Sequence, residues 1–151
     1  MVCVIQRVNF SSVVADGVNT GKTEKGLLVM LGVKLGDTED ICDKMAEKLV
    51  KMRIFEDENG KMNLSAADIG ATALIISNFT LCASCRRGTR PDFFAAEKPQ
   101  RANELYERFL SRVNSLGLHA ESGVFGAYMQ ITASLDGPVT IILDSEKDLA
   151  H

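Results

Sequence analysis

Two short segments interrupt apolar, strand-forming sequence with groups that can bind a polar substrate. The first, Ser77-Asn78-Phe79-Thr80-Leu81, directly follows the apolar run of residues 73–76. Hydroxyl, amide and backbone N–H groups at the end of a strand can hold a carbonyl oxygen or a hydroxyl in a cleft. The same groups can also satisfy only the neighbouring backbone, so the residues alone leave both interpretations open.

The second segment is Leu135-Asp136-Gly137-Pro138-Val139-Thr140. Proline lacks a backbone donor and is rare in the middle of a sheet, so a Gly-Pro pair between two strand-like runs has two explanations. It is either a plain turn between strands or a cis Gly137–Pro138 bond that a particular geometry requires.

The cysteines and histidines offer little further chemistry. Cys82 and Cys85 form a CxxC pair, and the other residues of the usual zinc-ligand types are Cys3, Cys42, His119 and His151. None of these is paired with another at ligand spacing, so no metal site is predicted. An arginine-rich loop follows Cys85 in place of a helix that would lower a thiol pKa. No dinucleotide, phosphate-loop or nucleophile-elbow motif occurs, and the isolated histidines build no catalytic triad, so no cofactor is predicted.

The charge balance excludes one class of protein and leaves another open. Lysine and arginine number 17 against 20 aspartates and glutamates, a formal net charge of −3, which excludes a globally basic nucleic-acid binder. A local cluster of cations follows the Ser77–Leu81 segment: Arg86, Arg87, Arg90, Lys98 and Arg101. Such a cluster is either a solvated loop or a contact surface for phosphates.

The length of 151 residues and the 46% hydrophobic content fit one globular domain with its own core. Apolar runs such as residues 26–33 are far shorter than the roughly 20 residues of a membrane span. The first residues also lack the pattern of a signal peptide, so we expect a cytoplasmic protein with reduced cysteines and no contact with a membrane.

Several elements must position these groups. Residues 1–8 and 26–33 predict buried strands, and residues 12–15 and 18–23 predict a hairpin around the turn pair Asp16-Gly17. An amphipathic helix is expected from Asp37, with apolar residues at spacings of four and three up to residue 52. Residues 57–60 predict a surface turn, and the chain from there to residue 70 is expected to be irregular.

The second half continues with a strand over residues 73–77 that extends toward residue 81, and then a loop over residues 82–98. A second helix is predicted from Pro99 to a stop at Gly117. Two strands, residues 128–133 and 139–143, are joined through residues 135–138. The order predicts a single α/β domain with mixed or antiparallel pairing and two main helices on one face.

Taken together in order, seven segments resemble the D-aminoacyl-tRNA deacylases. They are residues 4–8, 26–32, 53–55 with 60–63, 77–81, 88–93, 125–130 and 136–140. The resemblance implies a three-layer α/β/β fold and a homodimer with its active site at the subunit interface. It also implies hydrolysis of the ester that joins a D-amino acid, or glycine, to the 3′ end of tRNA, without a cofactor and without DNA as a partner.

The resemblance assigns roles to individual residues. The catalytic segment is Ser77, Phe79 and Thr80, and the substrate-binding residues are Arg7, Asn78, Phe125, Met129, Gly137 and Pro138. Weaker contacts to tRNA phosphates fall on Arg86, Arg87 and Arg90. Thr80 matches a candidate nucleophile, but a threonine hydroxyl needs an adjacent base. We therefore expect the terminal ribose 2′-hydroxyl to take part while the protein supplies positioning.

Two positions depart from the family pattern: Asn78 where glutamine is usual, and Leu135 where asparagine is usual. Asn78 shortens the reach of its amide by one methylene, and Leu135 removes an amide that would anchor the Gly-Pro unit. The loss at Leu135 motivates an alternative, a catalytically impaired relative that only binds aminoacyl-tRNA. A second alternative is a thiol redox protein that uses Cys82 and Cys85.

Overall fold

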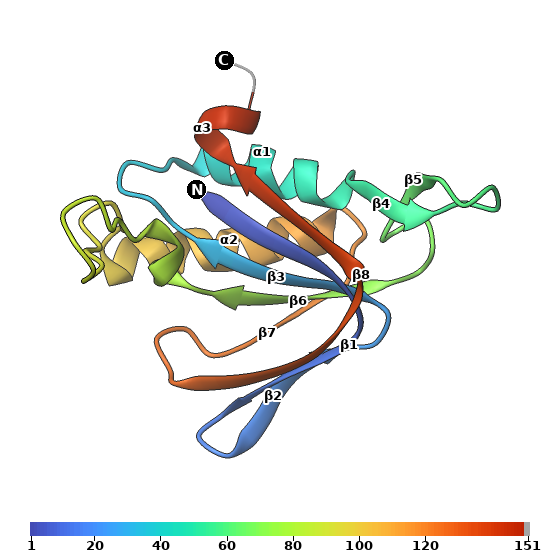
Figure 1. The fold of residues 1–151 in the computed structure, drawn as a ribbon, viewed down its shortest axis with the longest axis horizontal. Helices are drawn as coiled ribbons and strands as arrows, with labels where there is room; N and C mark the ends of the chain where they lie inside the picture. Colours follow the sequence, from blue (N-terminus) through green and yellow to red (C-terminus); the bar gives the residue numbers. More distant parts are fainter. Residues whose placement is uncertain (150–151) are drawn as a thin grey trace.

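The computed structural model describes residues 1–149, and His151 lies outside this range (Figure 1). Its strands are β1 Val2–Ala15, β2 Val18–Thr23, β3 Gly26–Gly32, β4 Arg53–Glu56, β5 Met62–Ser65, β6 Thr72–Ser77, β7 Ala120–Ser122 and β8 Met129–Asp144. Its helices are α1 Glu39–Val50, the 3-10 turn η1 Phe79–Cys82, α2 Pro99–Ser115 and α3 Ser145–Asp148. Across the described residues, no helix has the length and apolar character needed to span a membrane.

Six strands form one mixed sheet in the order β2-β1-β3-β6-β7, with β8 paired along nearly the whole length of β1. The β3–β6 and β6–β7 pairs are parallel, whereas β1 pairs antiparallel with β2, β3 and β8. A separate two-stranded ribbon consists of β4 and β5. The predicted mixed pairing is confirmed.

Alternation along the strands creates two cores, one on each face of the central strands. In β3, Leu27, Val29 and Leu31 pack in the core that α1 and α2 cover, while Leu28 faces the opposite way. Leu28 packs there with Val13 and other apolar residues of β1 and β6, because the sheet folds back on itself. Figure 1 shows the helices above the sheet and β2, β7 and the first part of β8 below it, while the second part of β8 rises beside β1 to α3, and this confirms the three-layer α/β/β arrangement.

The folded-back sheet nearly closes where β2 meets β7. A Cβ added at Gly21 would lie 2.5 Å from the carbonyl oxygen of Ser122, so only glycine permits this approach. The Lys22 backbone N–H donates to the Glu121 carboxylate at 2.7 Å in place of a partner strand. This contact protects part of the free edge of β2.

Both predicted helices form, and ion pairs join them. Thr38 caps α1 by accepting a hydrogen bond from the Ile41 backbone N–H. From α2, the Arg108 guanidinium donates to both carboxylate oxygens of Asp43 and also reaches Glu39. Since two nitrogens meet one carboxylate, this fork fixes how the helices lie against each other.

The expected irregular segment after residue 56 instead begins with the β4–β5 hairpin. The Asp57 side chain accepts from the backbone N–H groups of Asn59 and Lys61. This local side-chain turn brings two four-residue strands together that are too short to give a clear periodic pattern.

Two further expectations about strands were wrong. Residues 79–81 do not continue β6, because Asn78 accepts from the Thr80 backbone N–H and begins η1. Residues 135–138 do not reverse the chain, because β8 continues through them along β1. Gln6 pairs with Thr140 and Val8 pairs with Leu135, so the extra residues of β8 form a bulge. The Gly137–Pro138 bond within this bulge is cis.

Candidate active site

A pocket of about 720 Å³ opens at the C-terminal end of β6. Its walls come from the end of β6, the start of α2 and the loop between β7 and β8. Five of the expected site residues line it: Ser77, Asn78, Phe79, Phe125 and Met129. The structure therefore brings together two segments, residues 77–79 and 125–129, that are almost 50 residues apart in the chain.

The buried strand β6 delivers the polar end of the pocket. Residues 73–76 are fully buried, and the strand ends at Ser77, which lies on the boundary of the core. The Asn78 backbone N–H then donates to the Leu31 carbonyl of β3 at 2.8 Å. This bond fixes the direction in which the chain enters η1.

The side chain of Asn78 is engaged locally. Its Oδ1 atom accepts from the Thr80 backbone N–H at 3.2 Å and from the Thr80 hydroxyl. Thr80 is exposed and is absent from the pocket lining, and an amide oxygen is not a base that could activate its hydroxyl. The geometry thus favours a positioning role for this segment over nucleophilic catalysis.

Aromatic rings form two sides of the pocket. Phe79 meets Phe93 edge to face, with ring centroids 5.1 Å apart, and Phe125 lies 6.0 Å from Tyr106. The floor consists of apolar side chains from the core between the two sheet layers: Met30, Ile76, Met129 and Ile131. These surfaces suit a flat, apolar group such as a nucleobase or an aromatic side chain.

The pocket contains few groups that could transfer a proton or hold a metal. Glu97 and Lys98 are the charged residues that line it. The Glu97 carboxylate already accepts from the backbone N–H groups of Lys98 at 2.8 Å and Gly36 at 3.3 Å. Within residues 1–149, no group of three histidine, cysteine or acidic side chains has the arrangement of a metal site.

The Gly137–Pro138 unit lies elsewhere on the chain. Arg7 is 7% exposed, and its Nε atom lies 3.0 Å from Asp136 Oδ2, so the two side chains form an ion pair. The N–H at Nε does not point at an acceptor, so this contact is not a hydrogen bond. Its Nη1 donates to the Ile54 carbonyl at 2.8 Å. Arg7 thereby ties the bulge of β8 to β4.

The distance along β8 separates this unit from the pocket of the same chain. Gly137 follows Met129, which lines the pocket, by eight residue steps, and extended strand spans roughly 26 Å over that length. Gly137 and Pro138 are both exposed. Figure 1 shows β8 curving across the molecule between these two points.

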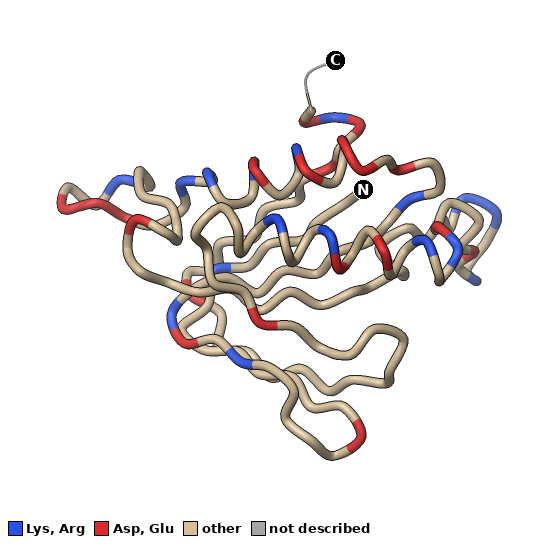
Figure 2. Tube along the Cα trace, turned by 180° about the vertical axis from the view of Figure 1, so that it is seen from behind, with Lys and Arg blue, Asp and Glu red and all other residues tan. Residues whose placement is uncertain are grey.

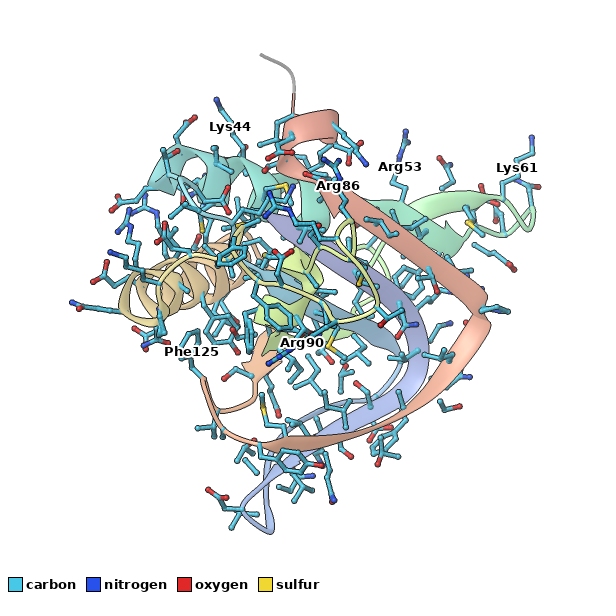
Figure 3. The ribbon with its side chains drawn as sticks, turned by 60° about the vertical axis from the view of Figure 1, so that its left-hand side comes forward. Lys44, Arg53, Lys61, Arg86, Arg90 and Phe125 are labelled. Carbon is cyan, nitrogen blue, oxygen red and sulfur yellow. The ribbon has the colours of Figure 1, made fainter. Side chains whose placement is uncertain are left out.

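A basic loop projects beside the pocket. Ser84 and Asp92 exchange two backbone hydrogen bonds of 2.9 Å, which close a loop that we call the arginine loop, residues 84–92. Figures 1 and 3 place it at the same end of the molecule as the β7–β8 loop that carries Phe125. Figure 2 shows its basic residues at the right-hand edge.

The arginines of this loop differ from the others. Five of the eight arginines have an acidic or amide partner: Arg7, Arg53, Arg101, Arg108 and Arg112. Within the described part of the chain, the guanidinium groups of Arg86, Arg87 and Arg90 have none. Arg101 pairs with Glu104 at 3.0 Å and Glu39 at 3.7 Å, so it does not belong with the available cations of the expected cluster.

Comparison with known families identifies the family and its activity. The model of the D-Tyr-tRNA(Tyr) deacylase family matches residues 4–144. The chain belongs to this family. It is therefore a hydrolase that acts on the ester of D-aminoacyl-tRNA.

Individual relatives are similar over nearly the full length. A D-aminoacyl-tRNA deacylase of Fervidobacterium nodosum is 50% identical over 147 residues, covering 97% of this chain and 99% of the relative. One from Persephonella marina is 52% identical over 146 residues, again covering 97% and 99%.

Two solved structures share the fold. A structure described as the c-Myc DNA Unwinding Element Binding Protein superposes with a TM-score of 0.90 at 37% identity, covering 95% of this chain and 98% of that one. A probable eukaryotic D-amino acid tRNA deacylase superposes with a TM-score of 0.78 at 15% identity, covering 94% and 97%.

The cysteines of this family member lack the features of a redox pair. Cys82 is buried and its Sγ lies 3.5 Å from the Val33 carbonyl, while Cys85 is exposed. Burial raises the pKa of the Cys82 thiol above its ordinary value. Since the thiolate is the reactive form, this shift works against redox chemistry at Cys82.

Sequence reasoning missed some residues of the pocket. Phe93 and Met30 fall in the family-like segments 88–93 and 26–32, but neither was given a role in the site, yet both line the pocket. The alternation of side chains along β3 could have located Met30, because Met30 and Leu28 share the face of the strand that points away from the helices. Nothing in the loop sequence indicated that Phe93 would pack on Phe79.

Proposed function

We propose that the pocket binds the aminoacyl-adenosine end of D-aminoacyl-tRNA. Phe125 and Met129 pack against the terminal adenosine, and Ser77, Asn78 and Phe79 border the aminoacyl ester. The observation that carries this proposal is the combination of aromatic and apolar walls with the polar end of β6 in one pocket. Backbone and side-chain groups at this end orient the ester carbonyl.

Hydrolysis then proceeds by attack of water on the ester carbonyl carbon. The bond from that carbon to the ribose oxygen breaks, the ribose oxygen takes up a proton, and free amino acid and tRNA are released. The terminal ribose 2′-hydroxyl assists, since Glu97, the carboxylate that lines the pocket, already accepts hydrogen bonds from two backbone N–H groups. Orientation of reacting groups is worth about 7–11 kcal/mol in favourable cases, so positioning is a sufficient source of rate enhancement.

We propose that the active unit is a homodimer in which the Gly137–Pro138 unit enters the pocket of the partner. The length of β8 between Met129 and Gly137 supports this, since one chain does not bring the two together. Large apolar side chains are also exposed on the paired strands β1 and β8, among them Leu135 at 45% and Ile142 at 66%. A second copy of the chain would cover them.

In this arrangement Leu135 lies in an apolar interface, and Asp136 with Arg7 replaces the amide anchor that Leu135 lacks. The Gly-Pro backbone then forms a rigid wall beside the α-carbon of the substrate, and an L side chain would collide with it. Glycine has no side chain, so the wall accepts glycyl-tRNA. A steric backbone wall discriminates more sharply than an apolar pocket, which yields only about 1–3 kcal/mol.

The arginine loop contacts tRNA phosphates through Arg86, Arg87 and Arg90, and Lys98 at the pocket lining meets the phosphate nearest the terminal adenosine. Unpaired guanidinium groups beside a substrate pocket support this role. We propose that residues 1–151 act as one domain in the cytoplasm, on tRNA and not on DNA.

The test is hydrolysis of matched D-tyrosyl-tRNA, L-tyrosyl-tRNA and glycyl-tRNA by purified protein. We expect loss of the D and glycyl esters while the L ester persists. Equal loss of D and L esters would overturn the wall, and binding without hydrolysis would favour an aminoacyl-tRNA-binding relative. A DNA hairpin of equal length should compete poorly with tRNA, and strong competition would overturn the preference for RNA.

A further inference from the structure

Tyr106 connects two walls of the pocket without lining it. It lies on α2, four residues after Ala102, so the two side chains share the helix face that turns toward the pocket. Tyr106 is 3% exposed, and its hydroxyl donates to the carbonyl of Ile75 in β6 at 2.7 Å. A buried tyrosine hydroxyl needs such a partner, and here the partner is the backbone of a strand that leads into the site.

This hydroxyl lies where β6 and β7 part. The parallel pairing of these strands ends at Ile75 and Ser122. Beyond that point, β6 continues to Ser77 on one side of the pocket, while the chain after β7 continues to Phe125 on the other. Burial raises the pKa of Tyr106 to about 12, against the opposing hydrogen bonds from the Ser122 side chain and the Gly123 backbone. The phenol is therefore neutral at physiological pH and remains a donor.

The ring of Tyr106 holds the second wall. Its centroid lies 6.0 Å from that of Phe125, within the range of favourable aromatic pairs. Phe125 is part of a short segment without regular structure, between Gly123 and Gly126. Phe125 is half-buried and packs against the core that α2 covers, and Figure 3 shows it on the same side of the molecule as that helix. Tyr106 is its aromatic contact in that core.

We propose that Tyr106 is a positioning residue for deacylation, a wedge at the β6–β7 fork that sets the spacing between Phe125 and the ester-binding end of β6. This inference rests on the proposed roles of those two walls. The adenosine binds to one wall and the ester reacts at the other. A change in their spacing leaves nucleotide binding in place while it moves the ester out of the reactive geometry, and a displacement of about 1 Å is enough to cost a large factor in rate.

The test is the conservative variant Tyr106→Phe, which keeps the ring beside Phe125 and removes only the hydroxyl. Its matched control is Thr23→Val. Thr23 is 2% exposed, and its hydroxyl is hydrogen-bonded to that of Thr72, the first residue of the same strand β6. Both variants lose one buried side-chain hydrogen bond on β6, but at opposite ends of the strand.

We expect Tyr106→Phe to lower kcat for D-tyrosyl-tRNA at least tenfold with KM changed by less than threefold. Thr23→Val should lower the melting temperature by a comparable amount and leave kcat unchanged. An unchanged kcat in Tyr106→Phe, or an equal loss of kcat in Thr23→Val, would overturn the proposal. Should Tyr106→Phe not fold, Ser122→Ala must lower kcat several-fold without raising KM, and a normal kcat refutes the wedge. Failure of the wild-type protein to hydrolyse the ester would instead refute the proposed function.

Discussion

The ion pair between Arg7 and Asp136 gives a prediction whose size follows from the structure. Asp136→Asn keeps the size of the side chain but leaves the Arg7 guanidinium, 7% exposed, without its charge partner. Removing one partner of a fully buried pair costs about 3–5 kcal/mol. The Asp136 side chain is 35% exposed, so solvent screening reduces the expected loss to about 1–2 kcal/mol.

Two assays check this number. A chain of 151 residues loses about 0.3 kcal/mol per degree near its unfolding midpoint, so the melting temperature should fall by about 3–6 °C. Hydrolysis of L-tyrosyl-tRNA should rise about 5- to 30-fold, because the same free energy no longer orients the Gly137–Pro138 wall. The control is Asp40→Asn, which breaks the exposed pair of Asp40 with Lys44 and should change neither quantity measurably. A lower melting temperature with unchanged discrimination would refute the reasoning about the wall.

Three further predictions concern the rest of the molecule. Replacing Arg86, Arg87 and Arg90 with glutamine should weaken tRNA binding and lower the slope of log affinity against log salt by about 2–3; an unchanged slope would mean that the loop does not contact phosphates. Replacing Cys82 and Cys85 with serine should leave kcat/KM for the D ester within twofold, and a large loss would revive the thiol interpretation. The Arg108 hydrogen bonds lower the pKa of Asp43, so the pair stabilises the fold above pH about 4 and this contribution is lost as the pH falls through the folded pKa. An Asp43→Asn variant should therefore show a shallower decrease in melting temperature with acid than the wild type, and parallel curves would contradict the assignment.

Segments with a regular repeat of apolar residues were predictable, because the spacing of those residues matches the repeat of a helix or a strand. The four- and three-residue spacing of apolar residues predicted α1, and the apolar run that became β3 predicted a strand buried on both faces. The turn at residues 57–60 was predicted, but the β4–β5 hairpin around it escaped notice because its two four-residue strands are too short to show a clear alternating pattern. β8 was divided in two because proline normally ends a central strand, whereas the paired strand β1 accommodates the extra residues as a bulge.

The candidate site was predictable only in part. Ser77 and Phe79 stood out as polar and aromatic residues at a strand end, and the resemblance to a family linked them to Phe125 and Met129. Tyr106 lies on the apolar face of α2 and drew no functional prediction, because a periodic pattern cannot distinguish a packed ring from one that also donates a hydrogen bond. In the proposed homodimer, the place of Gly137–Pro138 relative to the pocket depends on a second chain, which a single sequence does not contain.

A mixing experiment tests the shared site most directly. Phe125→Ala impairs the pocket but keeps the wall, whereas Asp136→Asn loosens the wall but keeps the pocket. In a mixture of the two chains, every intact pocket belongs to an Asp136→Asn chain. When this chain is refolded with a tenfold excess of the Phe125→Ala chain, random association gives about nine in ten of these pockets a partner with an intact wall. Since Asp136→Asn alone raises L-ester hydrolysis about 5- to 30-fold, we expect the ratio of L-ester to D-ester hydrolysis to fall about 4- to 8-fold below that of Asp136→Asn alone. An unchanged ratio would show that each pocket uses the wall of its own chain and would contradict the account.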